Sequence, residues 1–223
     1  MPVDLIILGA GGSSREIAEM ISATEGLARE YRIVGFLDDD PSNGGKVLDG
    51  VPIVGPLDAA SRYPEACFVV GVANHRDAGS RASIVQRVGL PPDRFVTLVH
   101  PMAFVSRNAA VGKGAIIMNN AVIATGVKIG AHVLISPGTQ IAHDSEVGNC
   151  SILAPRATIN GNVRIGECAY IGAAAVIAPN VVIGPGALVG IGAVVTNDVD
   201  ADCTVFGNPA RTINTGALRR WQS

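Results

Sequence analysis

The stretch that decides the fold is residues 123–147, IATGVKIGAHVLISPGTQIAHDSEV, in which every sixth residue is aliphatic. The same register runs without a break from residue 105 to residue 195. A small or β-branched residue stands four places after each aliphatic one, as Ala109 does after Val105. The sixteen aliphatic positions are Val105, Val111, Ile117, Ile123, Ile129, Ile135, Ile141, Val147, Leu153, Ile159, Ile165, Ile171, Ile177, Ile183, Val189 and Val195.

A period of six matches neither the 3.6-residue period of an α-helix nor the alternation of a simple strand. It is typical of a parallel β-helix, in which each hexad forms one short strand and one corner. The aliphatic residue points inward, and the pair two and three places later turns the corner, as Asn119-Asn120 and Pro137-Gly138 would. Three hexads close one triangular coil, so residues 18 apart are expected to stack about 4.8 Å apart.

The first hundred residues follow a different pattern, in which apolar strand-like runs alternate with helix-like runs. Alternation of this kind predicts a small parallel sheet with helices on both faces. The expected strands are residues 4–9, 32–40 and 67–74, and the expected helices are residues 13–26 and 81–90. We therefore divide the chain into a Rossmann-like α/β domain (1–100), a β-helix domain (101–213) and a C-terminal tail (214–223).

Composition narrows the functional class. The net charge of −2 gives no indication of a nucleic-acid partner or an anionic membrane. The N-terminus lacks the basic segment of a signal peptide, and no apolar run approaches the roughly 20 residues of a membrane helix. The four cysteines form no CxxC pair, which favours reduced thiols and a cytoplasmic protein.

The first strand ends in a glycine turn that resembles part of a dinucleotide-binding fingerprint. Gly9 and Gly11 fit G-x-G-x-x-G, but Ser14 stands at the third glycine position, so NAD is weakly indicated. A smaller ligand outside the strand ends is an alternative, with Asp38 and Asp39 of the second strand beside it. A purely structural turn with solvated acids is the other interpretation.

Histidines are the main candidates for chemistry, and one of the four occupies an unusual corner. His143 and Asp144 stand where the repeat usually has turn-forming residues. A corner faces outward, and one coil further on Gly161 would leave room beside the ring while Asn162 could hold the carboxylate. An imidazole with a neighbouring carboxylate is suited to act as a base at neutral pH. A surface histidine in a tolerant corner is the structural alternative.

A second constellation follows from the period alone. His132, Cys150 and Cys168 are 18 residues apart and should stack on one corner. Such groups could bind zinc, or the two cysteines could form a disulfide. Ligands in a straight column converge poorly on a tetrahedral ion, so no metal is expected.

Four motifs together resemble one known family: the GAGG turn (9–12), the LVHP junction (98–101), IAHD (141–144) and GNPAR (207–211). From residue 4 to residue 213 the chain is similar to the sialic acid O-acetyltransferase-like family of hexapeptide-repeat acyltransferases. The relatives include nucleotide-sugar N-acetyltransferases that act on bacillosamine, viosamine and perosamine derivatives. The resemblance implies a left-handed β-helix, a homotrimer with active sites between subunits, and acetyl-CoA as the acetyl donor.

The resemblance also implies roles for individual residues. His143 would be the catalytic base and Asp144 its acidic neighbour. The family's sugar-binding positions fall on Gly11, Gly12, Ser13, Asp38, Asp39, Ala73 and Asn74. Its acetyl-CoA positions fall on Ile152, Gly172, Ala173, Gly190 and Ile191. Ile152 replaces a family histidine and Arg156 a common glycine, while Ser13-Ser14 replaces His-Gly or Phe-Gly.

Three functional classes stay open at this point. The first is an acetyl-CoA-dependent enzyme that acetylates the amino group of a nucleotide-linked sugar. The second is an O-acetyltransferase acting on a sugar or on an amino acid such as serine. The third is a non-catalytic β-helix that binds a partner. The α/β domain favours a sugar acceptor, and the His143-Asp144 pair favours catalysis.

Overall fold

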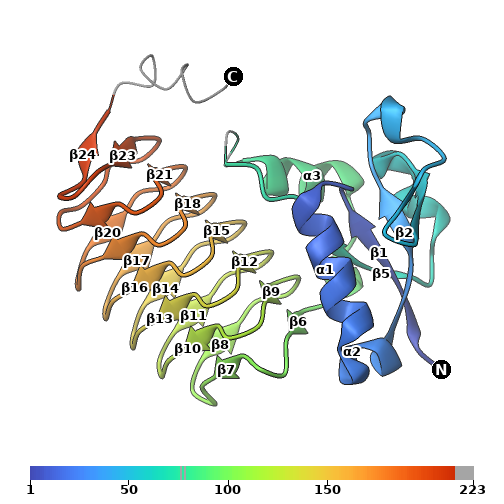
Figure 1. Cartoon of the computed structure of the whole chain (residues 1–223), viewed down its shortest axis with the longest axis horizontal. Coiled ribbons are helices and arrows are strands. Elements are labelled where there is room, and N and C mark those ends of the chain that lie inside the picture. Colours follow the sequence, from blue (N-terminus) through green and yellow to red (C-terminus); the bar gives the residue numbers. More distant parts are fainter. Residues whose placement is uncertain (76, 78, 214–223) are drawn as a thin grey trace.

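The computed structural model describes residues 1–75, 77 and 79–213. The α/β domain and the repeat domain lie side by side, with the coils of the repeat domain stacked along one axis (Figure 1). This arrangement confirms a parallel β-sheet domain followed by a parallel β-helix.

The α/β domain is built on a five-stranded sheet of order β3-β4-β2-β1-β5. All neighbours in it are parallel except the short edge strand β3, which is antiparallel to β4. The strands are β1 (Val3–Leu8), β2 (Tyr31–Leu37), β3 (Val47–Leu48), β4 (Val51–Gly55) and β5 (Cys67–Val70). The helices are α1 (Gly12–Ala23), α2 (Glu25–Glu30) and α3 (Ser80–Val88), with 3₁₀ turns η1 (Pro41–Asn43), η2 (Leu57–Arg62) and η3 (Pro92–Arg94).

Alternate residues of β1 enter two separate cores, which explains why β1 is a continuous apolar run. Leu5 and Ile7 pack with α1 on one face of the sheet. Ile6 and Leu8 pack with η2 and α3 on the other face. Helices therefore cover both faces, as the alternating sequence pattern predicts.

The β-helix begins at Leu98, slightly before the boundary drawn from the sequence, because β6 already pairs with β9. Its strands are β6 (Leu98–Val99), β7 (Phe104–Val105), β8 (Ala110–Val111), β9 (Ile116–Ile117), β10 (Val122–Ile123), β11 (Lys128–Ile129), β12 (Leu134–Ile135), β13 (Gln140–Ile141), β14 (Glu146–Val147), β15 (Ile152–Leu153), β16 (Thr158–Ile159), β17 (Arg164–Ile165), β18 (Tyr170–Ile171), β19 (Val176–Ile177), β20 (Val182–Ile183), β21 (Leu188–Val189), β22 (Val194–Val195), β23 (Thr204–Phe206) and β24 (Arg211–Thr212). Pairs such as Ile123↔Ile141 and Ile141↔Ile159 confirm the 18-residue stacking. The last coil is two residues shorter, since Leu188 pairs with Thr204.

The three sides of the β-helix are three sheets, which we call the docked, second and third faces. The docked face contains β6, β9, β12, β15, β18, β21, β23 and β24. The second face contains β7, β10, β13, β16, β19 and β22, and the third face contains β8, β11, β14, β17 and β20. The repeated aliphatic residues fill the interior, with only Val105 and Val111 in the first coil partly exposed. The second residue of most corners has a positive φ, as in Asn120 and Asn162, which suits Gly and Asn best.

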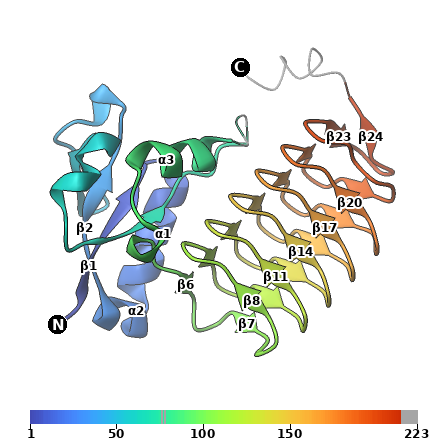
Figure 2. The same ribbon diagram turned by 180° about the vertical axis from the view of Figure 1, so that it is seen from behind.

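The α/β domain packs on the docked face through α1 and the apolar residues that point outward from β6, β9, β12 and β15. Leu98, Ile116, Leu134 and Ile152 form one buried cluster with Ile17 and other residues of α1 and the sheet. Figure 2 shows the same contact from behind, with α1 and β6 next to each other. Within the described residues, no helix has the length and apolar character needed to cross a membrane.

Candidate active site

The His143-Asp144 pair forms at an exposed corner between β13 and β14. The imidazole Nδ1 and Asp144 Oδ2 are 2.9 Å apart, and the two side chains are 58% and 62% exposed. A carboxylate at this distance favours the tautomer that carries the proton on Nδ1. The Nε2 atom is then an unprotonated nitrogen that can accept a proton from solvent or a ligand.

Glycine at position 161 makes room for the imidazole ring, as the sequence predicted. A Cβ atom at Gly161 would lie 2.7 Å from both Cε1 and Nε2 of His143. The Asp144 carboxylate lies against the preceding coil, since a Cβ at Gly126 would be 2.3 Å from its Oδ1. The expectation that Asn162 holds this carboxylate is wrong for the described side chains, which form no hydrogen bond between the two residues.

Within one protomer, the corner that carries His143 lies away from the α/β domain. His143 lies where the second and third faces meet, and the docked face forms the opposite side of the triangular coil. The glycine turn at the end of β1 belongs to the domain on the docked face. The structure therefore does not bring His143 together with Gly11 or Ser13 in one protomer.

The glycine turn offers open backbone at the start of α1. A Cβ at Gly11 or Gly12 would meet no atom within 4 Å, so these glycines leave free space over the turn. The helix has no side-chain cap and no acidic residue in its first turn. Its first N–H groups and positive dipole end can therefore receive a negatively charged or hydroxyl group.

Ser14 explains why the third glycine of the fingerprint is dispensable here. Its side chain is fully buried, and a Cβ at Gly71 would lie 2.3 Å from the Ser14 Oγ. The glycine at the end of β5 thus supplies the space that a glycine in the helix usually supplies. The Oγ has no hydrogen-bond partner among the described residues.

The two predicted acidic residues already have partners within the domain. Asp38 accepts hydrogen bonds from Ala10 N at 2.7 Å and Asp40 N at 2.9 Å, and so ties the end of β2 to the glycine turn. Asp39 accepts from Leu57 N at 3.0 Å and forms an ion pair with Arg87. Their first role is therefore to hold the edge of the sheet where β1 and β2 end.

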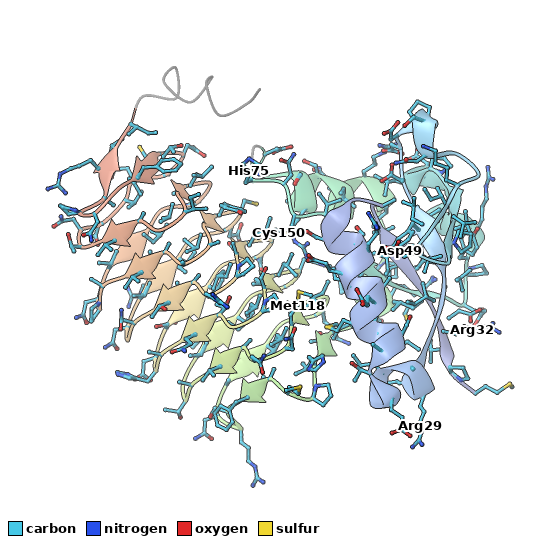
Figure 3. All side chains as sticks on the ribbon, in the orientation of Figure 1. Arg29, Arg32, Asp49, His75, Met118 and Cys150 are labelled. Carbon is cyan, nitrogen blue, oxygen red and sulfur yellow. The ribbon has the colours of Figure 1, made fainter. Side chains whose placement is uncertain are left out.

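The segment after β5 reaches toward the β-helix. Ala73 and Asn74 follow this strand, and the ring of His75 is 6.1 Å from that of Tyr170 on the docked face. Figure 3 shows His75 at the end of the segment that points to the coils. Ala73 and Asn74 thus lie on the same sheet edge as the glycine turn.

The residues predicted to contact acetyl-CoA divide into two groups. Ile152 is only 2% exposed and packs against the α/β domain, so its side chain is inaccessible to a cofactor in this structure. Ala173 lies on a corner that lines a groove, and Ile191 is 53% exposed one coil further on. Gly172 and Gly190 serve coil packing, because Cβ atoms there would lie 2.6 Å from Ile191 N and 2.0 Å from the Phe206 ring.

The groove beside Ala173 runs between α1 and the corners that join the docked and second faces. Its volume is about 780 Å³. It is lined by Glu16, Glu19, Met20, Ala23, Thr24, His100, Met118, Asn119, Pro137, Pro155, Arg156, Ala173 and Ala174. Its size matches that of a small-molecule site. Sequence reasoning missed the α1 side of this groove, because only the docking of the domains creates it.

The column of His132, Cys150 and Cys168 does not form a metal site. The His132 ring turns toward the preceding coil, where a Cβ at Gly114 would be 2.4 Å from its Nδ1, and packs edge-on against Phe95. Both cysteines are free thiols. Burial raises the pKa of Cys150 to about 11 and lowers that of His132 to about 4. Among the described residues, no three His, Cys, Asp or Glu side chains gather around a common point.

Comparison with known proteins identifies both domains. Residues 4–88 match the PglD N-terminal domain, and residues 108–142 and 126–161 match the bacterial transferase hexapeptide repeats. The UDP-N-acetylbacillosamine N-acetyltransferase of Bacillus subtilis (strain 168) is 34% identical over 117 residues, which cover 52% of this chain and 51% of that protein. The match thus spans about half the length of this curated relative.

Solved structures extend the similarity to nearly the whole chain. The acetyltransferase domain of PglB from Neisseria gonorrhoeae FA1090 is 31% identical, with a TM-score of 0.81 over 94% of this chain and 99% of that one. The same domain in complex with acetyl coenzyme A gives a TM-score of 0.83 at 29% identity, over 96% and 100% of the chains. A mutant of perosamine N-acetyltransferase from Caulobacter crescentus, in complex with CoA and GDP-perosamine, gives 0.83 at 27% identity, over 95% and 97%.

A coil of hexapeptide repeats joined to a small parallel α/β domain, with a histidine–carboxylate pair on an exposed corner, defines a hexapeptide-repeat acyltransferase. The resemblance drawn from the sequence is confirmed. The chain belongs to the hexapeptide-repeat acetyltransferases that carry a PglD-type N-terminal domain, the group that includes the acetyltransferase domain of PglB.

Proposed function

We propose that this protein transfers the acetyl group of acetyl-CoA to the amino group of a nucleotide-linked sugar. The observation that carries the proposal is the His143-Asp144 pair, whose imidazole lies against Gly161 and is more than half exposed. The relatives support the substrate class, because one acts on a UDP-linked bacillosamine derivative and another binds GDP-perosamine. The free cysteines of the present chain are consistent with a cytoplasmic enzyme.

In the proposed reaction the acceptor amine attacks the thioester carbonyl directly. The C–N bond forms, the C–S bond breaks, and CoA leaves as a thiolate, which becomes the thiol by receiving the amine's proton from the protonated His143. His143 Nε2 takes the proton that the amine loses, and the Asp144 carboxylate stabilises the resulting imidazolium. No protein nucleophile is required, which agrees with the raised pKa values of Cys150 and Cys168, since thiols in this state are poor nucleophiles.

The acceptor and the donor occupy different parts of the molecule in this proposal. The acceptor sits at the sheet edge formed by Gly11, Gly12, Ser13, Ala73 and Asn74. Asp38 and Asp39 shape that edge. Acetyl-CoA lies along the corners that carry Ala173 and Ile191, where the groove beside α1 gives it space.

A complete active site then requires a second copy of the chain, which supports the homotrimer implied by the family. The second face borders His143 and carries apolar side chains outward, with Phe104 61% and Val122 38% exposed. The third face also exposes Val182, but it carries the Lys128–Glu146 ion pair, which suits contact with water. We propose that three left-handed β-helices pack through their second faces and that His143 of one copy faces the α/β domain of the next.

The decisive experiment is a CoA-release assay with acetyl-CoA and a panel of acceptors. The panel contains UDP-, GDP- and dTDP-linked 4-amino sugars, the same sugars with a hydroxyl in place of the amine, the free amino sugars, and serine. We expect turnover with a nucleotide-linked amino sugar and an acetamide product by mass spectrometry. Turnover confined to hydroxyl acceptors would favour an O-acetyltransferase, and a lack of turnover with the whole panel would favour a binding role.

A further inference from the structure

Arg81, in the first turn of α3, is the largest fully buried side chain of the described residues. Its guanidinium lies at the contact between the two domains and donates to three backbone carbonyls. Nε donates to His132 O at 2.8 Å, and one terminal nitrogen, NH1, donates to Val70 O at 2.9 Å and Val72 O at 2.7 Å. One arginine thus connects the end of β5 to a corner of the β-helix.

The partners of Arg81 are unusual for a buried charge. A fully buried arginine is normally paired with a carboxylate, because taking an isolated charge out of water is costly. All three acceptors here are neutral carbonyls, and the other terminal nitrogen, NH2, has no partner among the described residues. Burial lowers the pKa of Arg81 to about 10, so the side chain keeps its charge at neutral pH.

The place of these contacts suggests what the buried charge does. The Val70 and Val72 carbonyls come just before Ala73 and Asn74 at the sheet edge. The His132 carbonyl belongs to a corner of the docked face, next to Phe95 and one coil from Cys150. Figure 3 shows Cys150 on the side of the β-helix that faces α1 and α3. The guanidinium therefore fixes the sheet edge relative to the coils.

We propose that Arg81 is a positioning residue that holds the acceptor-binding edge of the α/β domain at a set position on the β-helix, so that a bound sugar nucleotide meets the acetyl donor in register. The proposal rests on the proposed function, since the acceptor is assigned to this edge. Arg81 itself touches neither substrate. The guanidinium holds donors on several nitrogens in one rigid plane, so Nε can reach the β-helix while NH1 binds two carbonyls of the α/β domain. A lysine has three donors, but they leave from a single nitrogen and are not fixed in a plane.

The test compares Arg81→Met and Arg81→Lys with a matched control, Arg94→Met. Arg94 also donates to backbone carbonyls, with Nε 3.0 Å from Ala66 O and a terminal nitrogen 2.6 Å from Tyr63 O, but all its partners lie within the α/β domain. Each Met variant therefore removes an arginine that donates to backbone carbonyls, but of these two arginines only Arg81 connects the domains.

We expect Arg81→Met to raise the KM for the nucleotide-linked sugar about 10- to 100-fold, because a misplacement near 1 Å costs on that order. The KM for acetyl-CoA should rise less, because the corners that carry Ala173 and Ile191 belong to the β-helix itself and only the α1 side of the groove can shift. Arg81→Lys should fall between wild type and Arg81→Met. Arg94→Met should lower the melting temperature without this split. Equal changes in both KM values, or a wild-type acceptor KM in both Arg81 variants, would overturn the proposal. If Arg81→Met is insoluble, Arg81→Lys decides by the same criteria.

Amide hydrogen exchange separates this proposal from the proposed function, because it needs no acceptor. In Arg81→Met, exchange should rise in peptides that cover both β5 and the corner at His132, on either side of the contact. In Arg94→Met, the rise should stay within the α/β domain. If the enzyme acetylates no sugar but shows this exchange pattern, the proposed function is contradicted and the positioning role of Arg81 is retained. Unchanged exchange at the His132 corner in the Arg81 variants overturns the positioning role of Arg81.

Discussion

Two histidines of the same repeat show how much a residue's surroundings decide. His132 and His143 both occupy corners, 11 positions apart in the sequence. His132 is 8% exposed, because Phe95 and Arg81 of the α/β domain cover it. His143 is in contact with Asp144 and faces solvent. Only the second is placed to exchange a proton with a ligand.

The first prediction concerns His143 itself. His143→Asn keeps a polar side chain of similar size but removes the basic nitrogen. Since general-base catalysis is typically worth 10²–10⁴-fold, kcat should fall by about that factor. Acetyl-CoA binding, measured by calorimetry, should change little, and Asp144→Asn should be milder.

Thr125→Asn is the matched control for this variant, because Thr125 stands at the same exposed corner one coil earlier. It should retain wild-type turnover. Near-normal kcat in His143→Asn, with normal cofactor binding, would show that another group or water accepts the proton that the acceptor amine loses.

The second prediction uses the space beside the ring. In Gly161→Ala the new methyl group would sit 2.7 Å from the His143 ring, so the imidazole must turn away. We expect kcat to fall about tenfold or more, because misplacement of a catalytic group is costly. The free energy of unfolding should change by less than about 0.5 kcal/mol, since only the end of a mobile side chain moves.

Gly148→Ala is the comparison, because its Cβ would lie 2.5 Å from the backbone N of Glu167 in the next coil. Backbone cannot yield as a side chain does, so this variant should lose about 1–3 kcal/mol of stability in urea unfolding. Equal stability losses in Gly148→Ala and Gly161→Ala would contradict this distinction.

At the scale of elements, the structure separates residues that build the acceptor edge from those that face a ligand. The sequence places Asp38 and Asp39 at the end of β2, and the structure turns both carboxylates toward the protein. The end of β1, with Gly11 and Gly12, is the open part of the same edge. The end of β2 therefore supports this edge of the sheet, and the end of β1 is the part that is open to a ligand.

The third prediction follows from this division. Asp38→Ala removes the acceptor of the Ala10 N–H, 2.7 Å away, and should loosen the glycine turn. We expect the KM for the acceptor to rise about tenfold while that for acetyl-CoA stays the same, as steady-state kinetics with each substrate varied would measure. Asp58→Ala, which removes only an exposed partner of Arg87, should leave both values unchanged. Equal effects on both substrates would place the acceptor elsewhere.

At the scale of the whole molecule, the proposed site is divided between copies. The α/β domain covers the docked face, and the opposite corner carries His143. Neither half is complete alone, so the trimer is part of the proposed mechanism rather than an addition to it. Light scattering that gives one subunit of 22.8 kDa would contradict this arrangement.

The fourth prediction is complementation between two inactive variants. His143→Asn lacks the base, and Gly12→Glu places a like charge where the sugar's phosphates are expected while meeting open space in the fold. Coexpressed in equal amounts, random trimers should recover about a quarter of wild-type activity, since one neighbour pairing in four has both intact halves. No recovery in isolated mixed trimers would place the site within one chain.

The fifth prediction concerns pH and the contact between the domains. His132 has a pKa of about 4 in the folded protein, because burial and the nearby Arg81 disfavour its charged form. Between about pH 6.5 and pH 4 the unfolded chain binds a proton that the folded chain does not. The stability from this histidine is therefore complete above pH 6.5 and is lost as the pH falls.

The slope should reach about 1.4 kcal/mol per pH unit within this interval. Urea unfolding of wild type and His132→Asn at pH 7, 6 and 5 measures it as a difference between the two proteins. Asn is a suitable replacement because residue 132 has a φ of 58°. Identical slopes would show that His132 becomes protonated as easily in the folded chain as in the unfolded one.

The sequence by itself determined the coil. A six-residue period can be satisfied only by short strands and corners, so the inward positions, the 18-residue stacking and the exposed His143-Asp144 corner could all be read from spacing. The order of strands and helices likewise determined an α/β domain with both faces of its sheet covered. These features depend on the order and spacing of residues along the chain, which the sequence contains completely.

Only the tertiary structure decided which face of the coil receives the α/β domain. That docking buries Ile152, covers His132, encloses Arg81 and creates the groove beside α1. None of these follows from a period, because the repeat makes three similar faces and three similar corners. The choice among them depends on complementary side chains, such as Leu98 and Leu134 against α1, that lie far apart in the sequence and meet only when the two domains pack.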